Sequence, residues 1–181
     1  IRIFGDIESL PDAPFFDDSF YAFSVSKNLA AGHGLSIDGV HATNGFQPLW
    51  VVAIAPIWWL SSDPYVPLRI VYALSFLCLI GCWWQGRHLL RDLGVDDDAS
   101  RLTLIGLLFL SYTAFRHVFN GLETGLVVLV MLALFRGVLA YERKPDLIRS
   151  LLVGLLMGLA VLTRIDCGFY VLGGALSMAL W

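Results

Sequence analysis

Charge is scarce in this sequence. Only 15% of the 181 residues are charged, whereas 57% are hydrophobic, and the stretches 102–115 and 124–135 carry no charge at all. About a quarter of the residues in a typical soluble domain are charged. The composition is therefore atypical of a soluble domain and predicts a membrane protein.

Cysteine and clustered basic residues are also scarce. The chain has three cysteines, and their spacing matches neither a zinc site nor a disulfide framework. Cys78 and Cys82 lie four residues apart in an apolar segment, where cysteine behaves as a small hydrophobic residue. The net charge is −3 and no basic stripe is present, which excludes nucleic acid as an expected partner.

Long apolar segments predict an all-α fold, a polytopic transmembrane helix bundle. A bilayer-spanning helix needs roughly 20 mostly apolar residues. Residues 63–181 offer about four such spans and the start of a fifth, at 65–86, 102–119, 122–140, 150–163 and from about 168. The chain begins in polar sequence and ends in an apolar run, so we expect an excerpt of a longer protein with further helices on both sides.

Residues 1–62 are predicted to form a large external loop with two interfacial helices. The first runs from Asp17 to about Ala31 and is closed by Gly32 and Gly34. It is too polar to span, so we expect it to lie on the membrane surface. The second, Pro48–Leu60, would cover roughly 20 Å, too little to cross a hydrocarbon core of about 30 Å. Its tryptophans are expected to serve as membrane anchors and in packing.

Positive charge predicts the topology. Arginines flank the connection around residues 87–101, and arginines and a lysine flank the connection around residues 136–149. Two predicted spans separate these connections, so both are expected on the cytoplasmic side. Residues 121–124 and 163–166 then lie on the opposite side. Residues 1–47 join them there, provided that the Pro48–Leu60 segment does not cross the membrane.

Asp17 and Asp18 are the first candidate functional residues. Carboxylates at a helix start are favoured by the helix dipole and the free N–H groups, so a plain N-cap is one interpretation. Two adjacent acids can also accept a proton from a hydroxyl group or bind a divalent cation. The sequence leaves these interpretations open.

Further ionisable residues lie at the predicted ends of spans. Glu123 is either a helix cap in water or an acid that faces a cavity, and Arg116 and His117 add ionisable groups nearby. Arg164 and Asp166 form either a local ion pair or a site where the guanidinium binds a phosphate.

Four polar residues of the external loop complete the candidate set. His33 and His41 are either solvated or bind a metal or a phosphate, and they lie near Asp38 in the sequence. Asn44 belongs to a turn, and Gln47 can hydrogen-bond a sugar or a phosphate. We expect these residues, together with the acids and arginines above, to meet on one membrane face.

The order of these motifs resembles the GT-C superfamily of polytopic glycosyltransferases, including protein O-mannosyltransferases and the aminoarabinose transferase that acts on lipid A. The resemblance rests on Asp17-Asp18-Ser19-Phe20-Tyr21, on Asn28–Gly34 and on the segment Thr43–Trp50, and it extends to Glu123 and Thr163–Asp166. It covers most of residues 13–170. Gln47 departs from relatives that place a lysine or arginine near this position.

This resemblance implies a fold and a reaction. Asp17 would be the catalytic base with Asp18 beside it, and Glu123 would open a later span on the same face. The donor would be a polyprenyl-phosphate-linked sugar in a bacterial inner membrane, and the acceptor would lie on the periplasmic face. The superfamily varies in metal use, so a divalent cation at Asp17 and Asp18 is left open.

Two alternatives from other functional classes stay open. A lipid or solute transporter, or a flippase, would place charged residues within the spans. A non-catalytic membrane subunit would retain the fold and its acids inside a larger assembly of membrane proteins.

Overall fold

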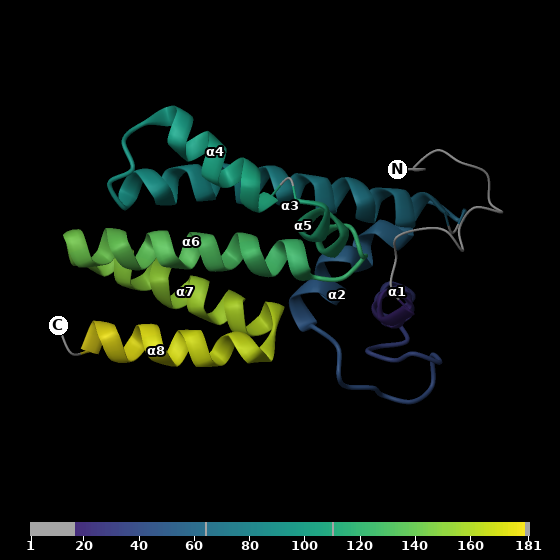
Figure 1. Cartoon of the computed structure of the whole chain (residues 1–181). Helices are drawn as coiled ribbons and strands as arrows, with labels where there is room; N and C mark the ends of the chain where they lie inside the picture. The colour runs from purple at the N-terminus through teal and green to yellow at the C-terminus, as the bar shows by residue number, and fades with distance from the viewer. Residues whose placement is uncertain (1–16, 64, 110, 180–181) are drawn as a thin grey trace.

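The computed structural model describes residues 17–63, 65–109 and 111–179, which form eight α-helices and no strand (Figure 1). Helices α3 (Tyr65–Asp92), α6 (Thr124–Arg143), α7 (Leu147–Thr163) and α8 (Gly168–Ala179) pack in chain order, each against the next. Short connections make successive helices antiparallel at α6–α7 and α7–α8. The predicted all-α fold is confirmed.

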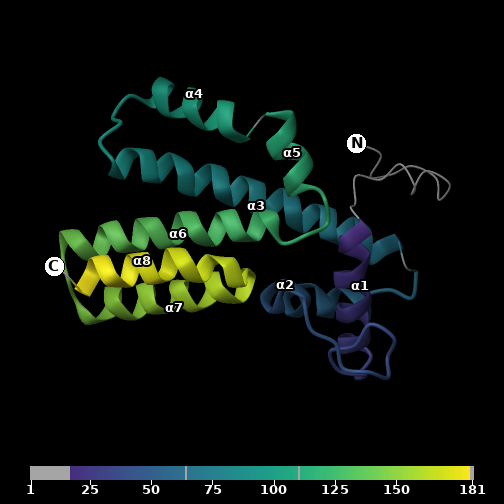
Figure 2. The same ribbon diagram turned by 60° about the horizontal axis from the view of Figure 1, so that its bottom comes forward.

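The first helices lie across one end of this bundle (Figure 2). Helix α1 (Asp17–Ala30) ends in a Schellman motif, in which His33 N–H donates to Asn28 O and Gly32 N–H donates to Leu29 O. Gly32 has φ +81°, a conformation that favours glycine. The predicted helix and its glycine stop are confirmed, and the chain then runs through an exposed loop to residue 47.

The segment after this loop is helical in two parts. Helix α2 (Pro48–Ile54) starts with proline at its first position, where no N–H is needed, and it continues into the 3₁₀ helix η2 (Ala55–Trp59). Both parts pack against α1. Buried side chains of α1 and α2 share an apolar core with Val71 and Tyr72 of α3 and with Phe119. The helices α1 and α2 are thus packed onto the bundle.

The predicted span 102–119 is wrong as a single helix. Helix α4 (Asp98–Phe109) is followed by a separate helix, α5 (Tyr112–Val118), on the other side of residues 110–111. Ser111 is extended, and its Oγ accepts a hydrogen bond from Ala114 N–H at 3.2 Å, so it acts as the N-cap of α5. A local capping residue therefore divides a segment whose overall hydropathy predicts continuity.

Two described helices, α3 and α6, are long and apolar enough to cross a membrane. This is fewer than the four spans predicted, because α4 and α5 are separate and α7 has 17 residues. Large apolar side chains are exposed on the outer helices, among them Leu104, Leu107, Leu108, Leu151, Leu155, Phe169 and Leu172.

The arginine-rich connections lie at the same end of the bundle (Figure 1). Arg136 donates to Asp92 through Nε at 3.0 Å, and Arg143 of the same helix also pairs with Asp92. Ion pairs therefore connect the C-terminal end of α3 with the C-terminal half of α6. Helices α1 and α2 lie at the opposite end (Figures 1 and 2).

Candidate functional site

A tight turn before α6 presents Glu123. Gly121 has φ +84°, and the Asn120 Oδ1 atom accepts a hydrogen bond from Leu122 N–H at 2.9 Å. Glu123 is the N-cap residue of α6, yet its side chain makes no capping hydrogen bond. Its side chain is only 3% exposed. These observations oppose the interpretation of Glu123 as an ordinary cap in water.

The buried carboxylate faces an arginine from another helix. Arg164 Nη1 lies 3.5 Å from Glu123 Oε1, and Arg164 Nη2 lies 3.0 Å from Asp166 Oδ2. Arg164 is extended between α7 and the 3₁₀ helix η3 (Ile165–Cys167). The structure thus brings together three of the predicted site residues, two of which are 41 positions apart in the sequence.

Arg164 bridges two acids in different surroundings. Its side chain is 45% exposed, whereas the exposed fractions of Glu123 and Asp166 are 3% and 74%. Burial raises the pKa of Glu123, and the Arg164 guanidinium opposes this shift. The pair therefore combines a buried carboxylate with a guanidinium that reaches solvent, and the exposed part of this guanidinium can bind an anion.

The loop between α1 and α2 is held to α1 by its own polar residues. Tyr21 OH lies 2.7 Å from Thr43 Oγ1 and donates to Asn44 O at 2.5 Å. Asn28 Nδ2 donates to Ser36 O at 2.9 Å. Asn44 therefore contributes its backbone carbonyl to loop closure, and its side chain is exposed. Gln47 is half-buried at the N-cap position of α2 and makes no side-chain capping bond.

The two loop histidines have different neighbours. His41 Nδ1 lies 2.8 Å from Asp38 Oδ2, and this contact is the largest cause that lowers the pKa of Asp38. His33 is exposed, and its ring lies beside Gly39. Within the described ranges no three histidine, cysteine or acidic side chains gather closely enough to hold a metal ion.

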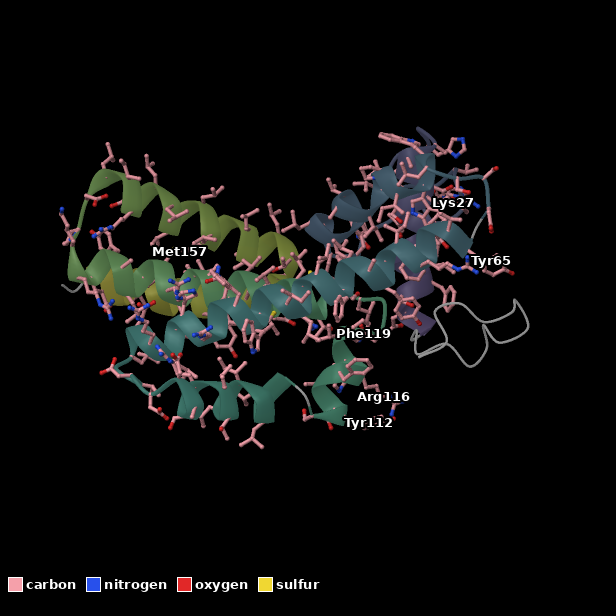
Figure 3. The ribbon with its side chains drawn as sticks, turned by 90° about the horizontal axis from the view of Figure 1, so that it is seen from above. Lys27, Tyr65, Tyr112, Arg116, Phe119 and Met157 are labelled. Carbon is pink, nitrogen blue, oxygen red and sulfur yellow. The ribbon has the colours of Figure 1, made fainter. Side chains whose placement is uncertain are left out.

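The remaining predicted residues lie near the same end of the molecule. Arg116 and His117 are exposed on α5, and Figure 3 shows Arg116 at the end of the bundle that carries α1. Phe119, three residues later, belongs to the core shared with α1. Asp18 is exposed in the first turn of α1. Asp17 begins this helix, and its side chain falls outside the described part of the structure.

One residue close to this site was not predicted as a site residue from the sequence. Trp50 is 1% exposed, and its Nε1 donates to Gly121 O at 3.1 Å. Its place in an apolar, tryptophan-rich segment indicated a membrane anchor or a packing residue. No local pattern shows that its N–H contacts a turn 71 residues away.

Comparison with known protein families, characterised proteins and solved structures finds no match for this chain.

Proposed function

We propose that this chain belongs to a membrane glycosyltransferase that moves a sugar from a polyprenyl-phosphate donor to a hydroxyl acceptor on the non-cytoplasmic face. The observation that carries the proposal is the Glu123–Arg164 pair, a buried carboxylate beside a partly exposed guanidinium. Glu123 precedes α6 and Arg164 follows α7, so the pair lies at the ends of these helices away from the connection that joins α6 to α7 (Figure 1). It is joined to the external helices through the contact from Trp50 to Gly121.

The membrane setting is supported by the outer surface of the bundle. Exposed leucines on α4 and α7 give these helices apolar outer faces, which are costly in water and favourable in lipid. Helices α3 and α6 have the length and composition of spans. We infer that the end with Arg143 and Arg149 faces the cytoplasm, and that α1 and α2 rest on the opposite surface.

In the proposed reaction, Arg164 binds the phosphate of the donor and neutralises it as the leaving group. Glu123 holds the guanidinium in place. The acceptor oxygen attacks the anomeric carbon, the bond from that carbon to the phosphate oxygen breaks, and the configuration inverts. Asp17 takes the proton of the acceptor hydroxyl, with Asp18 beside it, while Arg116 adds positive charge and His117 a polar side chain near the donor.

A transfer assay on the full-length protein in liposomes tests this proposal. The donor is a radiolabelled polyprenyl-phosphate sugar, and the variants are Asp17→Asn and Arg164→Gln. The first loses the base and the second loses the phosphate partner, so each should reduce transfer by about 100-fold or more. Arg149→Gln is the matched control, because it removes the same charge at the other end of α7, where Arg149 Nη1 donates to Lys144 O.

The outcomes separate the three functional classes. Transfer or hydrolysis of the labelled sugar that depends on Asp17 and Arg164 supports the enzyme. Movement of intact donor lipid between leaflets, without transfer, indicates a flippase instead. Neither activity, in a folded and inserted protein, indicates a non-catalytic subunit and rejects the proposal.

A further inference from the structure

Three indole groups of the segment 48–59 donate hydrogen bonds. One of these bonds reaches outside the external module, the name used here for residues 17–59 with α1, α2 and η2. Trp58 Nε1 donates to Ser26 Oγ at 2.8 Å, and Trp59 Nε1 donates to Ala30 O at 2.7 Å, both within α1. Trp50 Nε1 instead donates to Gly121 O at 3.1 Å, in the turn before α6. Trp50 therefore makes a polar link between the external helices and the turn that presents Glu123.

The acceptor of this hydrogen bond has a backbone conformation that favours glycine. Gly121 is buried and has φ +84°, and it lies two residues before Glu123. The neighbouring Asn120 is 2% exposed, and its side chain closes the turn onto Leu122. Glu123 directly follows this turn. A change in the orientation of the Gly121 peptide therefore displaces the Glu123 carboxylate.

The other partner of Glu123 is also adjacent to α2. Helix α2 packs against α7, which ends at Thr163, directly before Arg164. One short helix thus contacts both elements from which the Glu123–Arg164 pair is built. Trp50 is the buried residue of α2 that donates to one of them.

We propose that Trp50 is a positioning residue that holds Glu123 against Arg164 and ties the geometry of the donor site to the external module. Removal of the indole N–H leaves the Gly121 carbonyl buried without this donor. A buried acceptor that loses its partner is costly, so the turn rotates to find another one. Glu123 then moves away from Arg164, and the guanidinium is no longer held in place. The consequence for catalysis rests on the proposed function, whereas the positioning itself does not.

A conservative substitution separates the hydrogen bond from the packing. Trp50→Phe keeps an aromatic ring and removes the N–H. Trp58→Phe makes the same chemical change in the same segment, and its N–H contacts Ser26 and not the turn. For Trp50→Phe we expect a fall of about tenfold in kcat, the size of effect that one lost buried hydrogen bond produces. Trp58→Phe should stay within about twofold of the parent protein.

A double-mutant cycle tests whether Trp50 acts through Glu123. Glu123→Gln should itself lower transfer about tenfold, because the charge that holds Arg164 is lost. If Trp50 acts only through this carboxylate, Trp50→Phe should lower transfer by less than about twofold in the Glu123→Gln background. An additive loss of about 100-fold would overturn the positioning role, because Trp50 would then act independently.

A second readout does not need turnover. A water-soluble carbodiimide modifies carboxylates that it can reach, and mass spectrometry of the peptide that contains Glu123 measures the extent. Glu123 is 3% exposed, so labelling of the parent protein should be slow. Trp50→Phe should increase the labelling rate about tenfold, in line with one lost buried hydrogen bond, and Trp58→Phe should not change it.

The two readouts distinguish the proposals. Faster labelling of Trp50→Phe in a protein without any transfer activity supports the positioning and rejects the glycosyltransferase. Unchanged labelling in folded Trp50→Phe rejects the positioning whatever the activity is. Equal acceleration in both phenylalanine variants also rejects it, because a general loosening of the external module would then be the cause.

Discussion

Glu123 and Asp166 share the Arg164 guanidinium but differ in their exposure to solvent. Ion pairs in water contribute at most about 1 kcal/mol, whereas a buried charge carries a desolvation penalty that its partner must offset. The contact from Glu123 to Arg164 is long, at 3.5 Å, and burial still raises the pKa of Glu123. We infer that burial of Glu123 lowers the stability of the fold, and that its contact with Arg164 serves to bind the donor phosphate.

This inference makes a prediction about Glu123→Gln and pH. The pKa of Glu123 is raised in the folded protein, so the folded state binds more protons than the unfolded state above about pH 4.3. The free energy of unfolding that Glu123 contributes therefore falls as the pH rises, until the folded pKa is passed. We expect the melting temperature of Glu123→Gln, relative to the parent, to increase with pH across this window, as measured by thermal unfolding in detergent.

Asp166→Asn serves as the control for that measurement. It removes an exposed carboxylate from the same guanidinium, and it should change the free energy of unfolding by less than about 1 kcal/mol at any pH. A difference in melting temperature between Glu123→Gln and the parent that stays constant or falls as the pH rises would contradict the prediction. A fall would mean that the ion pair is a net stabilising contact.

At the scale of elements, the contact of α3 with α6 depends on small residues. A Cβ atom at Gly125 would lie 3.2 Å from Cys78 Cβ and 3.3 Å from Val118 Cγ1. Cys82, one turn after Cys78, lies 3.5 Å from Gly125 O. The two cysteines lie four residues apart and therefore share one face of α3, and this face packs against the start of α6.

Gly125→Leu should therefore separate α3 from α6. Overpacking of a tight contact costs roughly 1–3 kcal/mol, and the change should lower the melting temperature and the transfer activity together, because Glu123 lies two residues away. Gly154→Leu on α7 is the matched control, since a Cβ atom there meets nothing within 4 Å. Equal destabilisation by the two leucines would show that the close contact at Gly125 is not the cause, because leucine favours a helix more than glycine does and its helix propensity alone would stabilise both variants.

At the scale of the whole molecule, the arginine-rich connections and the polar loop before α2 lie at opposite ends of the bundle. The α3–α4 and α6–α7 connections lie at one end, and the loop between α1 and α2 lies at the other (Figure 1). In the proposed membrane orientation the first end is cytoplasmic. This orientation is a property of the complete helix arrangement, and no single residue defines it.

Cysteine accessibility in intact cells tests the orientation. Cys78, Cys82 and Cys167 are buried and unpaired, so a cysteine-free parent can be made by replacing them with alanine. A membrane-impermeant maleimide should label Val40→Cys, which is 79% exposed in the external loop, without permeabilisation. It should label Glu142→Cys, at the arginine-rich end, only after the membrane is opened. The reverse pattern would place the external module in the cytoplasm.

The sequence alone determined most of the helical architecture. Apolar segments, the glycine stop after Ala30 and the proline at the start of α2 are local signals, and local signals decide where a helix begins and ends. They also indicated Glu123, Arg164 and Asp166 as candidates. The division of 102–119 at Ser111 was missed, because a cap within an apolar run changes its mean hydropathy little.

The tertiary structure alone decided which of these residues meet. Glu123 contacts Arg164 across 41 positions, and Trp50 contacts Gly121 across 71. Such contacts depend on how α2, α6 and α7 pack, and many pairs of polar residues with similar local sequence do not meet. Burial also arises from packing: Glu123 and Asp166 are both acids at helix ends, and only the folded chain makes one of them buried and the other exposed.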